Sequence, residues 1–192
     1  MSVKELIFRD SKTKVEVECY TVVRSIGDVD SVKGTFRCLT EVWCWLWLTE
    51  TEYLDRKSDP KSWTPSSLPY PSAYNGIDVV IEPILNANGI NHHVRRLKDN
   101  KCKVLVGWNL NAVFFSHLDL RNFPLDKQEL VVDIMFSNYN DMEEEKTEFI
   151  FNWVDPRFAK FFVFQDPVWE LYSGINAIKR TKHVDPRHYE LR

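Results

Sequence analysis

The chain has 192 residues, of which 44% are hydrophobic and 28% are charged, and this suits one large globular domain. Its formal net charge of -3 gives no reason to expect a nucleic-acid partner. No apolar run approaches the roughly 20 residues that a membrane-spanning helix needs.

The cysteines show no zinc-site spacing and no C-x-x-C motif: Cys19, Cys38, Cys44 and Cys102. Cys38 and Cys44 lie an even number of residues apart on one predicted strand, so they share a face but are too far apart to bond. We therefore expect buried free thiols in preference to disulfide bonds.

The first quarter of the chain has the pattern of a helix and two strands. Residues 1–12 suit a short amphipathic N-terminal helix. Residues 14–24 alternate between apolar and polar side chains, which predicts a half-buried antiparallel strand, and residues 25–30 contain Gly27 and Asp28, which favour a turn. Residues 35–49 then form a second predicted strand.

This second strand is apolar on both faces. One face carries three tryptophans and the other carries aliphatic and thiol side chains: Trp43, Trp45 and Trp47 against Val42, Cys44, Leu46 and Leu48. A strand of this kind is covered on both faces, by a second sheet or by a neighbouring subunit.

Short strand-like segments separated by turns make up the rest of the chain. Residues 50–76 are rich in Pro and Ser, which predicts a loop. The expected strands then follow at 78–85 (an edge strand, because of Pro83), 94–97 and 103–109 (a hairpin), 112–115, 130–136, 149–154, 160–164 and 168–178. This pattern indicates an all-β sandwich or barrel.

A loop is predicted at residues 116–130, between two apolar strands. Pro124 fixes its own φ and keeps Phe123 out of the helical region, while Asp126 can close a turn by bonding to the backbone. Phe123 and Leu125 flank the proline as apolar anchors, so the loop is expected to be packed down.

Several segments occur in a recognisable order along residues 15–190. They are the turn before Thr35, the aromatic strand with Trp43, the segment 81–89 with Ile81 in place of Trp (or its competitor Trp63-Thr64-Pro65), the hairpin ending at Trp108, Phe123-Pro124-Leu125-Asp126-Lys127-Gln128, and Val168-Trp169-Glu170-Leu171. This order resembles the ligand-binding domain of pentameric ligand-gated ion channels, the Cys-loop receptors, whose soluble relatives include the acetylcholine-binding proteins.

The resemblance implies one domain over residues 1–192, folded as an immunoglobulin-like β-sandwich of about ten strands with a short N-terminal helix. It implies a homopentamer, or a ring with paralogues, that binds a small molecule in an aromatic box between subunits without catalysis or a cofactor. The implied box residues are Phe136, Tyr139 and Tyr189 on the principal side, and Trp43 (or Trp45) with Trp108 on the complementary side. π faces attract cations, and walls from two subunits make occupancy depend on assembly.

The resemblance also implies a membrane-facing end of the domain, formed by Asp28, Asp30, Phe123, Pro124 and Asp126. In a channel this end would couple ligand binding to ion transport, and contact with a membrane would run only through a pore domain outside these residues. No signal peptide or glycosylation sequon is present. We expect a cytoplasmic protein if Met1 is the native start, and an extracellular or membrane-associated one if the chain is an excised ectodomain.

Two departures from the family pattern stand out. Ser116 and Leu130 occupy the positions where paired cysteines would close the loop, so packing and hydrogen bonds must hold it. The absence of a vicinal cysteine pair at residues 180–190 also argues against acetylcholine-type recognition.

Other interpretations remain open. The aromatic residues can be core or subunit contacts, and the chain can be an intracellular scaffold that uses the sandwich for protein contacts. Ser116, His117 and Asp119 are triad residue types, but triads are built by geometry across a fold and not by adjacency. His92-His93 with Cys102 could bind a metal, although solvated histidines explain the pair more simply.

Overall fold

The computed structural model describes residues 14–60, 68–87, 89, 92–96, 101–118, 128–138, 148–154, 156–166, 177–179 and 188–191. Within them the chain is mainly β, as predicted, and its one helix lies in a segment that was predicted to be a loop. The elements are β1 (Lys14–Asp30), β2 (Thr35–Trp47), α1 (Glu50–Ser58), β3 (Pro69–Ala73), β4 (Gly76–Pro83), β5 (His92–Arg96), β6 (Cys102–Phe115), β7 (Val132–Asn138), β8 (Glu148–Trp153), β9 (Arg157–Gln165), β10 (Ala177–Lys179) and β11 (His188–Leu191).

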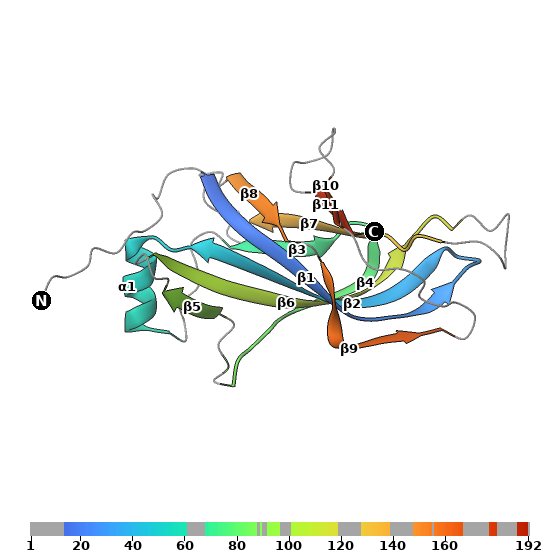
Figure 1. The fold of residues 1–192 in the computed structure, drawn as a ribbon, viewed down its shortest axis with the longest axis horizontal. Coiled ribbons are helices and arrows are strands. Elements are labelled where there is room, and N and C mark those ends of the chain that lie inside the picture. The colour runs from blue at the N-terminus through green and yellow to red at the C-terminus, as the bar shows by residue number, and fades with distance from the viewer. Residues whose placement is uncertain are drawn as a thin grey trace, which may run out of the picture.

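Seven strands form the larger sheet, in the order β4-β6-β2-β1-β8, with β5 also paired to β6 and β9 also paired to β1. The long strands β1, β2 and β6 form the centre of this sheet, and β2 runs antiparallel to both of its neighbours, β1 and β6 (Figure 1). β1 pairs in parallel with β8 and β9, so the antiparallel prediction for residues 14–24 is correct on one side of the strand and wrong on the other.

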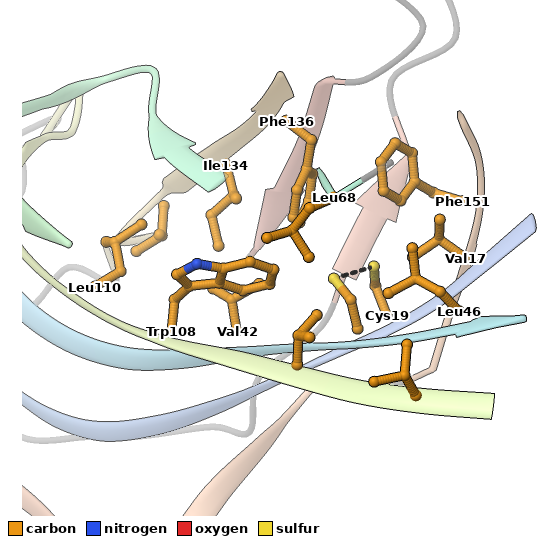
Figure 2. Packing of buried hydrophobic residues seen from close by; sticks show 14 of the residues in the cluster. Val17, Cys19, Val42, Leu46, Leu68, Trp108, Leu110, Ile134, Phe136 and Phe151 are labelled. Atoms are coloured by element: carbon orange, nitrogen blue, oxygen red, sulfur yellow. Dashed lines mark hydrogen bonds between the residues drawn. The ribbon is translucent and has the colours of Figure 1, made fainter. Parts of the chain in front are cut away.

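The smaller sheet has the order β10-β11-β7-β3, and all of its pairs are antiparallel. Its central strand β7 turns Ile134 and Phe136 toward the larger sheet, where both side chains are fully buried (Figure 2). Beneath them lie Val42, Trp108 and Cys19 from the larger sheet. The side chains of both sheets thus form one hydrophobic cluster.

Several predicted elements agree with the structure. On β2 the aliphatic and thiol face is buried in the cluster, while the three tryptophans lie half-buried on the opposite face. The hairpin exists as β5 paired with the first part of β6. β4 is an edge strand, since it pairs with β6 alone. All four cysteines are buried thiols, and none of them forms a disulfide bond.

Other predictions are wrong or concern residues that the structure does not describe. The turn expected at residues 25–30 lies at residues 31–34, because β1 continues through two β-bulges to Asp30. Residues 103–109 and 112–115 belong to one continuous strand, β6. The expected helix at residues 1–12, and residues 168–176 of the last long strand, lie outside the described residues.

The segment predicted as loop at residues 50–76 contains α1 and β3. Thr49 caps α1 with a capping box, in which the Glu52 N–H donates to Thr49 Oγ1 (3.3 Å) and the Thr49 N–H donates to Glu52 Oε2 (2.8 Å). The helix also has acidic residues in its first turn and basic residues in its last turn, which suits its dipole.

Candidate functional site

Trp43 lies on the face of the larger sheet that points away from the core. Because side chains alternate along a strand, its neighbours Val42 and Cys44 are fully buried on the core side, whereas Trp43 is only partly covered. Its partner across the sheet is Gly107 of β6. An added Cβ at Gly107 would lie 2.5 Å from Trp43 Cε3, so the indole packs closely over the backbone where β6 carries no side chain.

The indole of Trp43 is held from two directions. Its ring stacks on Tyr20 of β1, with centroids 6.3 Å apart and ring planes 12° from parallel. Its Nε1–H donates to Glu41 Oε2 at 3.0 Å. Packing, stacking and the hydrogen bond together fix the orientation of a large aromatic side chain on an outer face.

The Glu41 carboxylate, which accepts the hydrogen bond from Trp43, also forms an ion pair with Arg24. Glu41 is 9% exposed and accepts a hydrogen bond from Arg24 Nε at 2.7 Å, with a second close contact to Arg24 Nη2. Two guanidinium nitrogens thus contact the same oxygen, Oε1, and this pairing lowers the cost of burying the carboxylate. We call Tyr20, Arg24, Glu41, Trp43 and Gly107 the Trp43 surface.

Tyr20 has a cation on its own ring. The Arg157 guanidinium lies 5.5 Å from the centroid of the Tyr20 ring. Burial raises the pKa of the Tyr20 hydroxyl, and the Arg157 charge opposes that rise. The Trp43 surface therefore combines two aromatic rings with the ion pair of Glu41 and Arg24, and Arg157 lies beside it as a further cation.

Trp47 has different neighbours at the other end of the same face of β2. Lys103 Nζ lies 4.3 Å from the centroid of the Trp47 ring, and Lys101 Nζ lies 5.3 Å from it. Lys103 also pairs with Glu18 Oε1 at 2.7 Å. Here the chain's own lysines occupy the π face, which leaves Trp43 as the better candidate for an external ligand.

Trp108 and Phe136, two of the expected box residues, lie in the core. Trp108 is 3% exposed and makes an edge contact with Tyr70, with ring centroids 6.2 Å apart. Phe136 is 0% exposed and stacks on Phe151 at 4.7 Å (Figure 2). Since Trp108 pairs with Val42 and not with Trp43, the structure places Trp43 and Trp108 on opposite faces of the sheet.

The remaining box residues are described less completely. Tyr139 lies outside the described residues. For Tyr189 the structure describes the backbone alone, which pairs with Ile134 of β7. Of the expected box, only Trp43 is shown with its side chain on an outer face.

Ser116 closes the neck of the loop at 116–130. Its Oγ–H donates to the Glu129 carbonyl at 2.7 Å, and its Oγ accepts from the Val131 N–H at 3.4 Å. These two bonds flank Leu130, the residue opposite Ser116 in the expected cysteine pair. One side chain therefore joins the segments before and after residues 119–127 through two hydrogen bonds.

Two further contacts join this neck to the rest of the domain. The Asn75 amide donates to the carbonyls of Phe115 (2.7 Å) and Val131 (2.8 Å), so one side chain connects β6 to the start of β7. The turn at residues 31–34 meets the same neck, where the Ser116 N–H donates to the Gly34 carbonyl at 2.8 Å. Gly34 has φ +65°, and an added Cβ would lie 2.8 Å from the Ser116 carbonyl oxygen.

The acidic residues expected at the membrane-facing end lie on the bulged end of β1. Asp28 adopts φ +50° and pairs with Arg37 at 3.4 Å. Asp30 accepts hydrogen bonds from the backbone N–H groups of Val32 and Lys33, both at 3.0 Å. The bond from Lys33 is the main cause that lowers the pKa of the Asp30 carboxyl. Phe123, Pro124 and Asp126 lie outside the described residues.

Two features are absent from the described part of the chain, a cluster of metal-ligating side chains and a helix that could span a membrane. No group of three or more His, Cys, Asp or Glu side chains there is placed to hold a metal ion. On β5, His92 is buried and His93 exposed, and Arg96 is the residue that pairs with Cys102. None of the described helices has the length and apolar character needed to cross a bilayer.

Sequence reasoning missed most of the partners of these residues. The ion pair of Arg24 and Glu41 joins residues far apart in sequence, and the pairing of Gly107 with Trp43 depends on the register between β2 and β6. Comparison of the chain with models of known protein families and with curated protein sequences found no match.

Proposed function

We propose that this chain is a non-enzymatic domain of the kind found in pentameric ligand-gated ion channels, and that it binds a small molecule where two copies meet in a ring. The proposal includes the finer fold that the resemblance implies, an immunoglobulin-like sandwich of about ten strands. It is compatible with a channel ectodomain and with a soluble relative.

The Trp43 surface is the observation that carries the proposal. It presents an oriented indole on the outer face of a sheet. The Trp43 nitrogen donates a hydrogen bond to Glu41, whose carboxylate is paired with Arg24. Such an arrangement offers a rigid aromatic wall at low entropic cost, which is what a binding interface requires. The wall is one-sided within one chain, so a second copy is needed to enclose a ligand.

The loop neck gives independent support. Ser116 and the residues beside Leu130 meet through hydrogen bonds at the two positions where the family pattern has its disulfide. Within the proposal, Trp43 is the complementary-side residue, and Tyr139 and Tyr189 of the adjacent copy supply the principal side. Trp108 and Phe136 support these faces from the core.

A ligand-induced thermal shift tests the box. The probe is tetramethylammonium chloride, a cation that an aromatic wall can bind, with sodium chloride at equal ionic strength as the reference. We expect Tm to rise with probe concentration in the wild type and in Trp47→Ala, and to stay flat in Trp43→Ala. Equal shifts in the wild type and Trp43→Ala would rule out this box.

A scaffold that makes protein contacts is the second candidate. Large apolar side chains are exposed at both edges of the larger sheet, Val80 (52%) on β4 and Phe161 (78%) on β9. Exposed apolar side chains on edge strands favour association with other chains. Self-association without any probe-dependent shift would favour this candidate over ligand binding.

A further inference from the structure

Two of the four buried cysteines lie against each other in the centre of the larger sheet. Cys19 of β1 and Cys44 of β2 are direct partners in the antiparallel register. Their sulfur atoms are 3.1 Å apart and share a hydrogen bond, drawn as a dashed line in Figure 2. Both side chains are 0% exposed.

The other two thiols are too distant to compete. Cys38 lies six residues before Cys44 on the same extended strand, which corresponds to roughly 20 Å. Cys102 lies beside Leu48, whose N–H donates to the Cys102 carbonyl at 3.1 Å, and is thus roughly 13 Å along the strand direction from Cys44. Proximity therefore selects one pair among the four cysteines.

We propose that Cys19 and Cys44 form a reversible redox site that a small-molecule disulfide oxidises to a covalent link between β1 and β2. Directly paired residues of antiparallel strands have Cα atoms about 4.5–5.5 Å apart, within the range that a disulfide spans. The sulfur atoms need to approach by roughly 1 Å to reach bonding distance. This inference is independent of the ligand-binding proposal.

The chemistry is thiol–disulfide exchange. One cysteine, as thiolate, attacks a sulfur of the small disulfide, which forms a mixed disulfide and releases one small thiol. The second cysteine then attacks the protein sulfur of that mixed disulfide, and the second small thiol leaves. The two protein thiols lose two electrons and two protons, and the small disulfide gains them as two thiols.

Burial controls the access of the oxidant. It is the largest cause that raises the pKa of the Cys19 thiol well above its ordinary value, and the hydrogen bond that Cys19 shares with Cys44 adds to it. The closed sheet therefore protects the pair, and exchange requires transient separation of β1 from β2 or takes place during folding. Once formed, the link would join β1 to β2 at a position where each strand has a further neighbour. On β1, the Cys19 carbonyl accepts a hydrogen bond from the N–H of Val154, which follows β8. On β2, Cys44 pairs with Val106 of β6.

The test is refolding from denaturant in buffers with graded ratios of glutathione disulfide to glutathione. Intact mass and peptide mapping then identify the product. We expect the wild type to lose the mass of two hydrogen atoms with a Cys19–Cys44 peptide link, and its Tm to rise relative to the reduced form. The double variant Cys38→Ala/Cys102→Ala keeps the pair and should behave in the same way. Cys44→Ala should show no loss of two hydrogen atoms.

Refolding in the redox buffer removes burial as a barrier, so a negative result is informative. Four free thiols at every ratio in the folded wild type would overturn the proposal, as would a link that involves Cys38 or Cys102. If Cys44→Ala fails to fold, Cys19→Ala serves as the second variant, and the peptide map of Cys38→Ala/Cys102→Ala decides the assignment without either.

Discussion

At the scale of single residues, the contact between Trp43 and Gly107 determines whether the indole can lie flat on the sheet. A glycine is required at position 107 because the three atoms nearest to an added Cβ belong to the Trp43 ring. The two positions should therefore be energetically coupled.

We expect Gly107→Ala to lower the free energy of unfolding by about 1–3 kcal/mol, since the added methyl forces the indole to shift. Urea denaturation measures this loss. In a Trp43→Ala background the same substitution should cost much less, because the clashing ring is gone. An equal cost in both backgrounds would show that the indole does not lie over Gly107.

His92 makes stability depend on pH. Burial is the main cause that lowers its pKa to about 4, and the charge of Arg56 lowers it further. Between pH 6.5 and about 4 the unfolded chain thus binds a proton that the folded chain does not. The stability that the uncharged His92 contributes to the folded chain is fully present above pH 6.5 and is lost as the pH falls toward 4.

We expect the urea midpoint of the wild type to fall across this window, and His92→Gln to flatten the fall. His93→Gln, at the exposed neighbouring position, is the control and should keep the profile of the wild type. Identical profiles for all three proteins would show that His92 titrates normally.

At the scale of elements, the neck of the loop depends on one hydroxyl. Ser116→Ala removes both hydrogen bonds across the neck and leaves the Glu129 carbonyl without that donor. We expect a loss of about 1–2 kcal/mol in the free energy of unfolding and faster backbone hydrogen exchange at the start of β7. The control is Ser58→Ala, which removes an exposed hydrogen bond to the Asp55 carbonyl and should cost less.

The capping box of α1 gives a second prediction at this scale. Thr49→Ala should cost about 1 kcal/mol, measured by urea denaturation, because the side-chain acceptor for the Glu52 N–H is removed. Thr51→Ala changes an exposed position in the same first turn and should be nearly neutral. A similar loss in both variants would argue against the cap.

The difference between prediction and structure is also clearest for elements. The strand β2 could be predicted from the sequence because its side chains alternate in character and every second residue faces the core. α1 was missed, although Thr49 followed by Glu52 is a capping-box signal, because the nearby prolines and serines favoured a loop. The turn was placed at Gly27-Asp28, since a β-bulge uses the same residue types as a turn.

The candidate site depends on pairing that a local pattern cannot supply. Trp43 was predicted to lie on the aromatic face of its strand, and it does. Its separation from Trp108 follows from the register of β2 and β6, which aligns Trp43 with Gly107 and Val42 with Trp108. The parallel pairing of β1 with β8 and β9 joins segments more than a hundred residues apart, beyond the reach of any strand pattern.

At the scale of the whole molecule, the two sheets enclose one hydrophobic cluster, while the outer face of the larger sheet carries oriented aromatic side chains. In the proposed function the Trp43 surface provides one wall of a ligand site, and a ring would place the same wall at every interface. Ligand binding and assembly are therefore linked in the proposed function, because the box is incomplete in an isolated chain.

Mass in solution tests this central claim most directly. Light scattering and native mass spectrometry at high protein concentration report the assembly without knowledge of the ligand. The proposal predicts a closed particle of about five times the 22.7 kDa chain, which Trp43→Ala weakens more than Trp47→Ala does. A particle that stays at 22.7 kDa at every concentration, with or without tetramethylammonium, would contradict it.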